Sequence, residues 1–367
     1  MEIVPVTTDR DLHAFLRLPW HIYRDDPRWV PPLLFEQRQL LTGQHPFFEK
    51  AEMRLFLARH GGEVVGRVAA ILDYHFLERH RDPVGFFGFF ECAADGDVTE
   101  RLLGAARAFL GDKGMRAIRG PVNPSMHHPC GLLVEGFEFP PAFLMPYNPP
   151  AYRGLLEGAG CQKAKDLLAY RVVIPALPPP KVGRFSAVAE QKGMRVRPIN
   201  MKRLQEEVEI FRNLYNTAWQ HNWGFTPMTP AEARWMARHL KSLLVPSLTL
   251  IAETQGQPIG FLMLLPDYNQ VLRHLDGRLG PVGLLKFLWY RRRIRDARLI
   301  LLGVSPEYRA RGADALLTHA ALQGLKKKGF IHAEISWLLE DNRVVLRFAE
   351  RWGGTLYKRY RIYELPV

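Results

Sequence analysis

The clearest pattern of apolar and polar positions lies in the last third of the chain. An apolar run from Leu299 to Val304 precedes a short basic loop, and small and apolar residues at helical spacing begin near Gly312. Apolar and polar residues alternate over residues 331–336, and Asn342 then opens a helical pattern that ends at residues 352–354. This pattern predicts the order strand, loop, helix, strand, helix.

The pattern of the first half of the chain recurs in the second half, about 194 residues later. In each half an apolar strand runs into a glycine turn and out into a second apolar strand, which predicts a hairpin. The aligned positions are Ala58, Gly62 and Gly66 in the first half and Ala252, Gly256 and Gly260 in the second. We therefore predict tandem copies of one α/β fold, as domains 1–178 and 194–367 joined by a Pro-rich linker at 179–193.

Length and composition fit two folded domains. The chain has 367 residues, 47% of them hydrophobic and 24% charged, which is too many residues for one ordinary core. No apolar run is long enough to span a membrane, the start lacks the features of a secretion signal, and the three cysteines are scattered. These features predict a cytoplasmic protein with reduced thiols.

The net charge of +13 indicates attraction to an anionic partner, such as an acyl-CoA, a membrane surface or a nucleic acid. The sequence has no nucleic-acid-binding motif, so we expect no nucleic-acid partner. His127, His128 and Cys130 lie close together but lack a second ligand pair at zinc spacing. We therefore expect no metal.

The loop before the helix at Gly312 has the chemistry of an anion site. Free backbone N–H groups at a helix start, together with the helix dipole, favour negative charge. Gly312 and Ala313 would let a ligand approach the backbone, and the side chains of Arg309 and Arg311 suit phosphate oxygens. The loop therefore predicts a phosphorylated ligand.

The whole ordered set resembles the coenzyme A site of the GNAT acyltransferase superfamily, and the chain resembles tandem bacterial members of it. In that family an Arg/Gln-x-x-Gly-x-Gly/Ala loop holds the pyrophosphate. Arg309, Gly312 and Asp314 stand at its positions here, Asp314 in place of the usual Gly or Ala. The resemblance implies a mixed, mostly antiparallel central sheet flanked by helices in each domain. It also implies acetyl-CoA or a longer acyl-CoA as co-substrate, bound by Gly303, Val304, Arg309, Ala310, Arg311, Gly312, Ala313, Asp314, Ala315 and Asn342.

The first half differs at the corresponding loop. Residues 92–97 contain no arginine and two aspartates, which is the wrong charge for a pyrophosphate. We therefore expect the second half to bind the cofactor. The first half would be a degenerate copy that either supports the second or contributes one wall of the acceptor pocket.

The resembled family often places a Glu on the fourth strand as base and a Tyr in the last helix as acid. Here the strand at 298–304 has no carboxylate, and the Tyr position falls on Ala349. The candidate substitutes for the proton-transfer role are Glu334, His332, His221 and Asp267. Glu334 shares one strand face with His332 and Ser336, which would form either an acceptor wall or a face of structural hydrogen bonds.

The stretch from Trp219 to Phe225 interleaves aromatic and polar side chains. It follows the first helix of the second half, where the resembled family builds its acceptor site. Such a mixture fits a pocket with an apolar body and a few orienting groups, although an aromatic cluster can equally be plain core. The candidate acceptor-binding residues are Trp219, Asn222, Trp223, Phe225, Asn269 and Ser336.

About 30 residues separate Leu265 from Leu299, more than a hairpin needs, so the insert is expected to have a function. Its segment 284–295 carries Leu, Phe, Trp and Tyr followed by four arginines and an isoleucine. This composition is typical of a helix at a membrane surface, which would place the protein peripherally at the inner face of the membrane. The alternatives are a packed helix with solvated arginines or a contact for the CoA 3′-phosphate.

Three functions follow as hypotheses. The first is an acyl-CoA-dependent N-acyltransferase whose acceptor is an amine, in one version an amphiphilic amine, because the chain also resembles bacterial GNAT-like enzymes that make ceramide-type lipids. The second is a non-catalytic acyl-CoA or lipid-binding protein, since the usual Glu and Tyr are missing. The third is a tRNA-dependent aminoacyl transferase, because such enzymes also pair GNAT-like domains and are basic.

Overall fold

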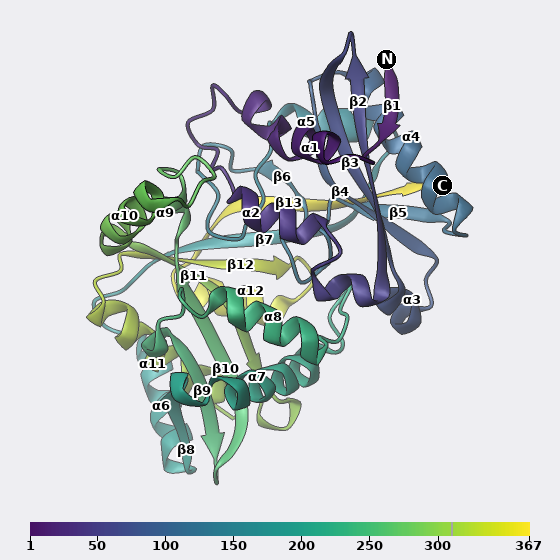
Figure 1. Ribbon diagram of the computed structural model, residues 1–367. Coiled ribbons are helices and arrows are strands. Elements are labelled where there is room, and N and C mark those ends of the chain that lie inside the picture. Colours follow the sequence, from purple (N-terminus) through teal and green to yellow (C-terminus); the bar gives the residue numbers. More distant parts are fainter. Residues whose placement is uncertain (310) are drawn as a thin grey trace. The chain divides into compact units, whose positions relative to one another are not determined.

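The computed structural model describes residues 1–309 and 311–367, which form two compact units. Unit 1 comprises residues 1–168, 271–288 and 357–367, and unit 2 comprises residues 169–270 and 289–356. Each unit has a mostly antiparallel sheet flanked by helices (Figure 1), so the predicted fold class is confirmed.

The elements of unit 1 cover most of the first half of the chain. Its strands are β1 (Glu2–Pro5), β2 (Ala51–His60), β3 (Glu63–Asp73), β4 (Val84–Cys92), β5 (Ala117–Gly120), β6 (Leu132–Glu135) and most of β13 (Thr355–Pro366). Its helices are α1 (Asp9–Ile22), α2 (Leu34–Leu41), η1 (Pro46–Lys50), α3 (Tyr74–His80), α4 (Gly96–Asp112), α5 (Ala151–Gly158) and most of α10 (Pro281–Tyr290). Strand β7 (Gln162–Val173) and helix α9 (Asn269–Leu272) run from one unit into the other.

The elements of unit 2 cover most of the second half. Its strands are β8 (Met194–Pro198), β9 (Thr249–Thr254), β10 (Gln257–Pro266), β11 (Asp296–Val304) and β12 (His332–Leu339). Its helices are α6 (Pro180–Gln191), η2 (Met201–Arg203), α7 (Leu204–Trp219), α8 (Pro230–Leu240), η3 (Pro246–Leu248), η4 (Arg291–Arg293), η5 (Pro306–Tyr308), α11 (Ala313–Lys327) and α12 (Arg343–Arg351).

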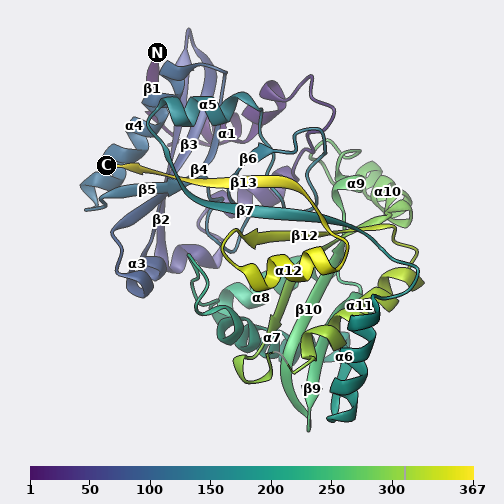
Figure 2. The same cartoon turned by 180° about the vertical axis from the view of Figure 1, so that it is seen from behind.

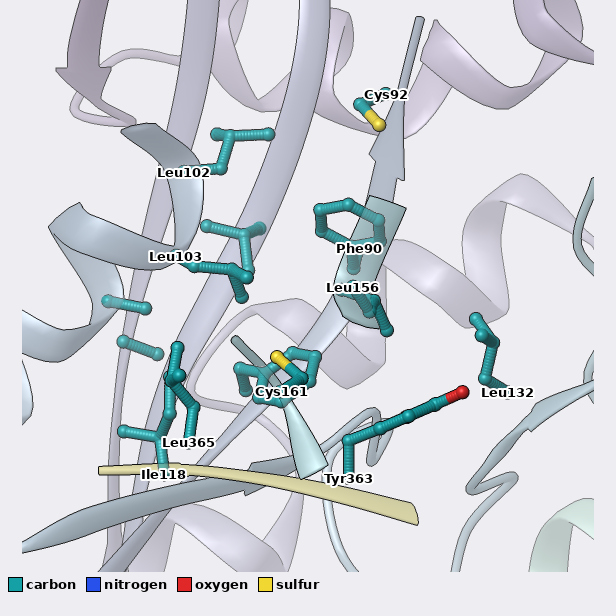
Figure 3. Close-up of a cluster of buried hydrophobic side chains, with 14 of the residues drawn as sticks. Phe90, Cys92, Leu102, Leu103, Ile118, Leu132, Leu156, Cys161, Tyr363 and Leu365 are labelled. Atoms are coloured by element: carbon teal, nitrogen blue, oxygen red, sulfur yellow. The ribbon is translucent and has the colours of Figure 1, made fainter. Parts of the chain in front are cut away.

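The sheet of unit 1 has the order β1-β2-β3-β4-β5-β13, and β6 also pairs with β13. Its pairs are antiparallel except β4 with β5, which run parallel. Leucines of α4 and the side chains of Tyr152 and Leu156 of α5 form the buried core against this sheet, together with Phe90 and Ile118 (Figure 3). These side chains fix α4 and α5 against the end of β4.

The sheet of unit 2 has the order β12-β11-β10-β9-β8, with β11 and β12 parallel and the other pairs antiparallel. Phe261 of β10 packs in a core with Tyr215 of α7 and Ala233 of α8. A side chain on the neighbouring Gly260 would instead meet Leu317 of α11. Since successive strand residues point to opposite faces, α7 and α8 cover one face of this sheet and α11 covers the other.

Both predicted hairpins are present, and they turn in the same way. The β2–β3 turn has Gly61 and Gly62 at φ of 57° and 87°, and the β9–β10 turn has Gln255 and Gly256 at 50° and 76°. Two left-handed residues in a two-residue turn match the twist of the flanking strands. Ala58 pairs with Gly66 and Ala252 with Gly260 in equivalent registers, as the repeat predicts.

The two compact units do not coincide with a division into residues 1–178 and 194–367, and residues 169–178 already belong to unit 2. The insert 271–288 and the last strand, from Tyr357 on, belong to unit 1. Strand β13 pairs there with the short strands β5 and β6 (Figure 2), because both offer edge backbone groups that need a partner. Residues 180–191, expected as linker, form α6, which opens at Pro179-Pro180 and belongs to unit 2.

Among the described residues, every helix is too short or too polar to cross a lipid bilayer.

Candidate functional site

The candidate site in unit 2 begins where β11 and β12 separate. Their parallel pairing runs from Asp296 opposite His332 to Leu299 opposite Ile335. Register in the β10–β11 pair shifts between Met263 and Leu264, which leaves a bulge in β11 immediately after Leu299. The two strands then run apart (Figure 1). The second half of β11 still pairs with β10 on one side, but it no longer pairs with β12 on the other.

The loop after β11 is braced by Arg309. Its Nε donates to the carbonyl oxygen of Val304 over 3.2 Å, and its Nη2 donates to the carbonyl oxygen of Ala218 near the end of α7. These bonds tie the loop to the last turn of α7, where carbonyls otherwise lack partners. Arg309 therefore shapes the loop, in addition to any contact it makes with a ligand.

Arg311 is the cation at the entrance to α11. Its side chain is exposed, and its guanidinium lies 5.7 Å from the ring centre of Tyr308. Gly312 is the N-cap of α11, with φ of 96° and no side chain to cap the helix, and Ala313 is buried directly behind it. The first turn of α11 therefore offers backbone N–H groups and positive dipole charge next to an exposed guanidinium.

The other predicted members of this loop have different surroundings. Asp314 is exposed in the first turn of α11, and its carbonyl accepts the Thr318 hydroxyl. Ala315 is buried. Ala310 lies outside the described residues. Asn342 caps α12, because its Oδ1 accepts the backbone N–H of Val345 over 3.3 Å.

Helix α6 forms a wall of this site that the sequence did not predict. A Cβ on Gly312 would lie 2.9 Å from the Phe185 carbonyl oxygen and 3.2 Å from the Ala189 Cβ. Ala189 is fully buried, whereas the side chains of Phe185 and Val188 are 58% and 41% exposed. Helix α6, which packs against the start of α11, therefore exposes the apolar side chains of Phe185 and Val188 to solvent. A substitution at Gly312 would displace α6 as well as any ligand, so Gly312→Glu is a poor probe of ligand binding.

A buried polar cluster marks the point where β11 and β12 separate. Arg298 of β11 stands opposite Glu334 of β12, and Ser336 follows on the same face. The Nε of Arg298 lies 2.8 Å from the Ser336 Oγ and 3.7 Å from the Glu334 Oε1, and the Ser336 hydroxyl donates to that carboxylate. All three side chains are buried. The structure thus brings Glu334 and Ser336 together around a buried ion pair.

Two other candidates lie at the opposite end of β11. The backbone N–H of Asp267 donates to the carbonyl of Asp296, the first residue of β11, and the Asp267 side chain accepts the backbone N–H of Asn269. At about 3.3 Å per strand residue, Asp296 and Gly303 are roughly 20 Å apart. The structure therefore does not bring Asp267 and Asn269 to the loop that contains Arg311.

The aromatic stretch after α7 is divided between core and surface. Phe225 is buried and Trp219 packs on the same core, with the ring of Tyr215 4.8 Å from that of Trp219 and 5.7 Å from that of Phe225. The Trp219 Nε1–H reaches the carbonyl of Leu302 over 3.4 Å, which holds α7 against the second half of β11. Asn222 and Trp223 are partly exposed, and His221 is exposed.

The equivalent place in unit 1 is filled by protein. Gly66 pairs with Cys92 as Gly260 pairs with Val304, so Cys92 has the register of Val304. The Tyr152 hydroxyl accepts the Cys92 N–H over 2.8 Å and lies 3.0 Å from the Glu91 carboxylate, which also accepts the Tyr23 hydroxyl over 2.8 Å. The N-terminus of α4 is likewise occupied, since Asp95 caps it.

Burial shifts the pKa values of the ionisable side chains around Glu91 in unit 1. The Arg67 Nη2 lies 3.7 Å from the Glu91 carboxylate and its Nη1 donates to the Phe15 carbonyl over 2.6 Å. Burial nevertheless raises the pKa of Glu91 to about 7, and it raises the pKa values of Tyr23 and Tyr152 as well. In unit 2 the positions equivalent to Arg67 and Glu91 are Phe261 and Gly303, which carry no charge.

Residues 208–354 match the family described as Acetyltransferase (GNAT) family. The chain is 37% identical to Protein YghO of Escherichia coli over 97% of its own length and 93% of that protein. It is 35% identical to a protein of Caulobacter vibrioides named bacterial ceramide synthase, over 99% of its own length and 97% of that protein. This chain belongs to the GNAT family, as a tandem member.

Solved structures agree with the tandem GNAT fold. A tandem GNAT protein from the clavulanic acid biosynthesis pathway matches with a TM-score of 0.59 and 14% identity, covering 100% of this chain and 98% of that one. A GNAT protein of Sphaerobacter thermophilus matches with a TM-score of 0.55 and 12% identity, covering 99% and 95%. The GNAT fold implies an acyl-CoA co-substrate and supports N-acyltransferase activity in general. In the part of the chain that the structure describes, no group of three or more His, Cys, Asp or Glu side chains could hold a metal.

Proposed function

We propose that this protein transfers an acyl group from acyl-CoA to the amine of a long-chain, amphiphilic acceptor, using unit 2. The observation that supports this most directly is the start of α11, where Arg311 is exposed beside a helix N-terminus that none of the described side chains caps. This start follows the stretch of β11 that has parted from β12. A pyrophosphate would bind at the first feature and the pantetheine arm would extend along the second.

In the proposed reaction the neutral amine nitrogen attacks the thioester carbonyl, a C–N bond forms, and the C–S bond breaks to release the CoA thiol. The ammonium proton must leave, and the developing oxyanion needs a donor. Backbone N–H groups near Gly303 and Val304 would supply that donor. His221 is the candidate acceptor of the proton, because it is exposed two residues beyond Trp219, whose indole reaches Leu302 of β11.

A long-chain acceptor is favoured by the relative named bacterial ceramide synthase, which this chain matches over nearly the full length of both proteins. The test combines the purified protein with acetyl-CoA or palmitoyl-CoA and with either a long-chain amino alcohol or a short water-soluble amine. Thiol release is followed with a colorimetric reagent and the product by mass spectrometry. The proposal predicts amide product with the long-chain amine, and thiol release without amide would contradict it.

The matched variants for this test are Arg311→Glu and Arg10→Glu. Both residues are exposed arginines, but Arg10 lies on α1 of unit 1. We expect Arg311→Glu to lose turnover while its melting temperature stays that of the wild type, and Arg10→Glu to keep both. Equal turnover in the two variants would move the phosphate site away from α11.

One feature favours a second candidate, a non-catalytic acyl-CoA-binding protein. Ala349 stands at the position where the resembled family has its Tyr, and alanine has no hydroxyl that could act as the acid. Ala349 is also fully buried. This candidate predicts that acyl-CoA raises the melting temperature while no amine tested yields an amide. Amide formation with any amine would exclude it.

A further inference from the structure

Helix α10 of the insert carries its apolar side chains on the outside. Val282, Leu284, Leu285, Leu288 and Trp289 are all exposed, by between 44% and 69%. The partly buried positions of this helix are Gly283, Phe287 and Tyr290. On a helical wheel the five exposed apolar residues share one face and the partly buried ones share the opposite face. An ordinary surface helix turns its apolar face towards the core, whereas α10 turns these five apolar side chains towards solvent.

The segment that bears α10 is firmly attached to unit 1. The Trp20 indole N–H donates to the Asp276 carboxylate over 2.7 Å, and the backbone N–H of Leu34 donates to the Gly277 carbonyl over 3.0 Å. Val271 and Leu275 are buried. These contacts hold the segment in place, so the exposed apolar face belongs to an anchored helix.

The charged residues of residues 277–295, which include α10, all have one sign. Residues 277–295 contain six arginines and lysines and no aspartate or glutamate. Arg291, Arg292 and Arg293 follow α10 directly, and all three are exposed. The Arg293 guanidinium lies 4.8 Å from the ring centre of Trp289, so the cation and the aromatic ring share one location.

We propose that this face of α10 docks the protein on an anionic lipid surface. Leucine, valine and tryptophan side chains would enter the boundary between headgroups and acyl chains, and the arginines would contact the phosphates of the headgroups. This inference does not depend on the proposed acyltransferase activity. It would also explain how a long-chain amine, which partitions into lipid, reaches the protein.

A second copy of the chain fits this face less well. A symmetric contact between two α10 helices would gather Arg291, Arg292 and Arg293 of both copies at one interface. With no acidic residue between positions 277 and 295 to offset them, such a contact would be repulsive. One helix of ten residues is also small beside the area that a stable dimer buries.

The test is co-sedimentation of the full-length protein with vesicles of phosphatidylcholine alone or with added phosphatidylglycerol. We expect binding to the anionic vesicles that falls as salt rises. Leu285→Glu should weaken this binding by at least about tenfold, since it puts a carboxylate into the apolar face. Leu177→Glu is the matched control, because Leu177 is 78% exposed and lies outside the helices. Replacing Arg292 and Arg293 by glutamine should cost about fivefold for each arginine.

A second measurement keeps the proposal testable if a variant folds poorly. Brominated lipids should quench wild-type fluorescence more than that of Trp289→Phe. Wild-type protein that binds neither vesicle, or Leu285→Glu that binds like the wild type, would overturn the proposal. Dimers that Leu285→Glu converts to monomers, without vesicle binding, would overturn it in favour of a second copy. Turnover of the long-chain amine supplied in detergent, without vesicles, should be unchanged in Leu285→Glu, so failure of docking is distinct from failure of the acyltransferase proposal.

Discussion

The Tyr152 hydroxyl accepts a hydrogen bond of 2.8 Å from the backbone N–H of Cys92. Cys92 has, in unit 1, the register position that Val304 has in unit 2. Tyr152 is almost completely buried, and its hydroxyl lies against the β4 backbone at this position. The two copies of the fold thus share their strands and hairpin turns but differ at this register position.

This difference predicts one acyl-CoA per chain. Titration calorimetry with a non-hydrolysable acyl-CoA should give a stoichiometry near one, and Arg311→Glu should abolish the binding heat. The matched change at the other copy is Asp95→Ala, which removes the cap of α4. We expect it to leave binding unchanged and to lower stability by about 1 kcal/mol. Two binding sites, or a loss of binding in Asp95→Ala, would show that unit 1 also takes the cofactor.

Glu91 predicts a pH dependence of stability. Its pKa is raised from 4.5 to about 7, chiefly by burial. Between these values the folded protein holds a proton that the unfolded chain has released, so stability falls as pH rises through this window and is level above it. The shift corresponds to about 3 kcal/mol.

The measurement for Glu91 compares melting temperatures of the wild type and Glu91→Gln from pH 4 to pH 8. Glutamine cannot titrate, so the wild type should lose stability relative to the variant as pH rises. Below about pH 7 the folded wild type holds Glu91 as a neutral carboxyl, which resembles glutamine, so the two proteins should be most alike near pH 4. A difference between the two proteins that does not vary with pH would refute the assignment.

Much of unit 2 could be predicted from the sequence because its signals are local. The glycine turn between β9 and β10, the basic loop after Val304 and the Asn342 cap of α12 each depend on a few neighbouring residues. The placement of β13 could not be predicted in this way. Its partners β5 and β6 are more than 200 residues away, and many strands have the apolar pattern that such an edge accepts.

For the candidate site too, the sequence predicted the local features but not the contacts between distant elements. The loop with Arg311 and Gly312 followed from its composition, whereas the contact of α6 with Gly312 depends on packing between elements over 120 residues apart. The Pro178–Pro180 run made residues 179–193 resemble a linker, although proline at the start of a helix is equally common. The sequence likewise did not show which residues of the Trp219–Phe225 stretch are buried. In the structure Trp219 and Phe225 pack against Tyr215 in the core, whereas His221 between them is exposed.

The exposed face of α6 predicts a contact with the cofactor. Phe185 is 58% exposed and its backbone carbonyl lies beside Gly312 at the start of α11. We expect Phe185→Ala to raise the KM for acyl-CoA several-fold while kcat and the melting temperature stay near those of the wild type. Phe35→Ala is the control, since Phe35 is 47% exposed on α2 of unit 1. An unchanged KM would place the cofactor away from α6.

His221 offers a test of proton transfer. Loss of a positioned base typically costs a factor of about 100 or more in kcat. We therefore expect His221→Gln to lower kcat by that order with little change in the KM for acyl-CoA. His13→Gln, an exposed histidine on α1, is the control. If His221→Gln retains both kcat and the pH profile of the wild type, the proton leaves through another group.

The ion pair with Arg298 predicts a structural role for Glu334, which the sequence analysis named as a candidate base. Glu334 is 6% exposed and Arg298 is 4% exposed, so removal of either charge leaves the other buried without compensation. Such a loss typically costs about 3–5 kcal/mol, whereas replacing both partners by apolar residues of similar size costs far less. Melting temperatures should therefore fall more in Glu334→Leu and in Arg298→Met than in the double variant. If Glu334→Gln instead keeps its stability but loses turnover, Glu334 would be the base and not part of the framework.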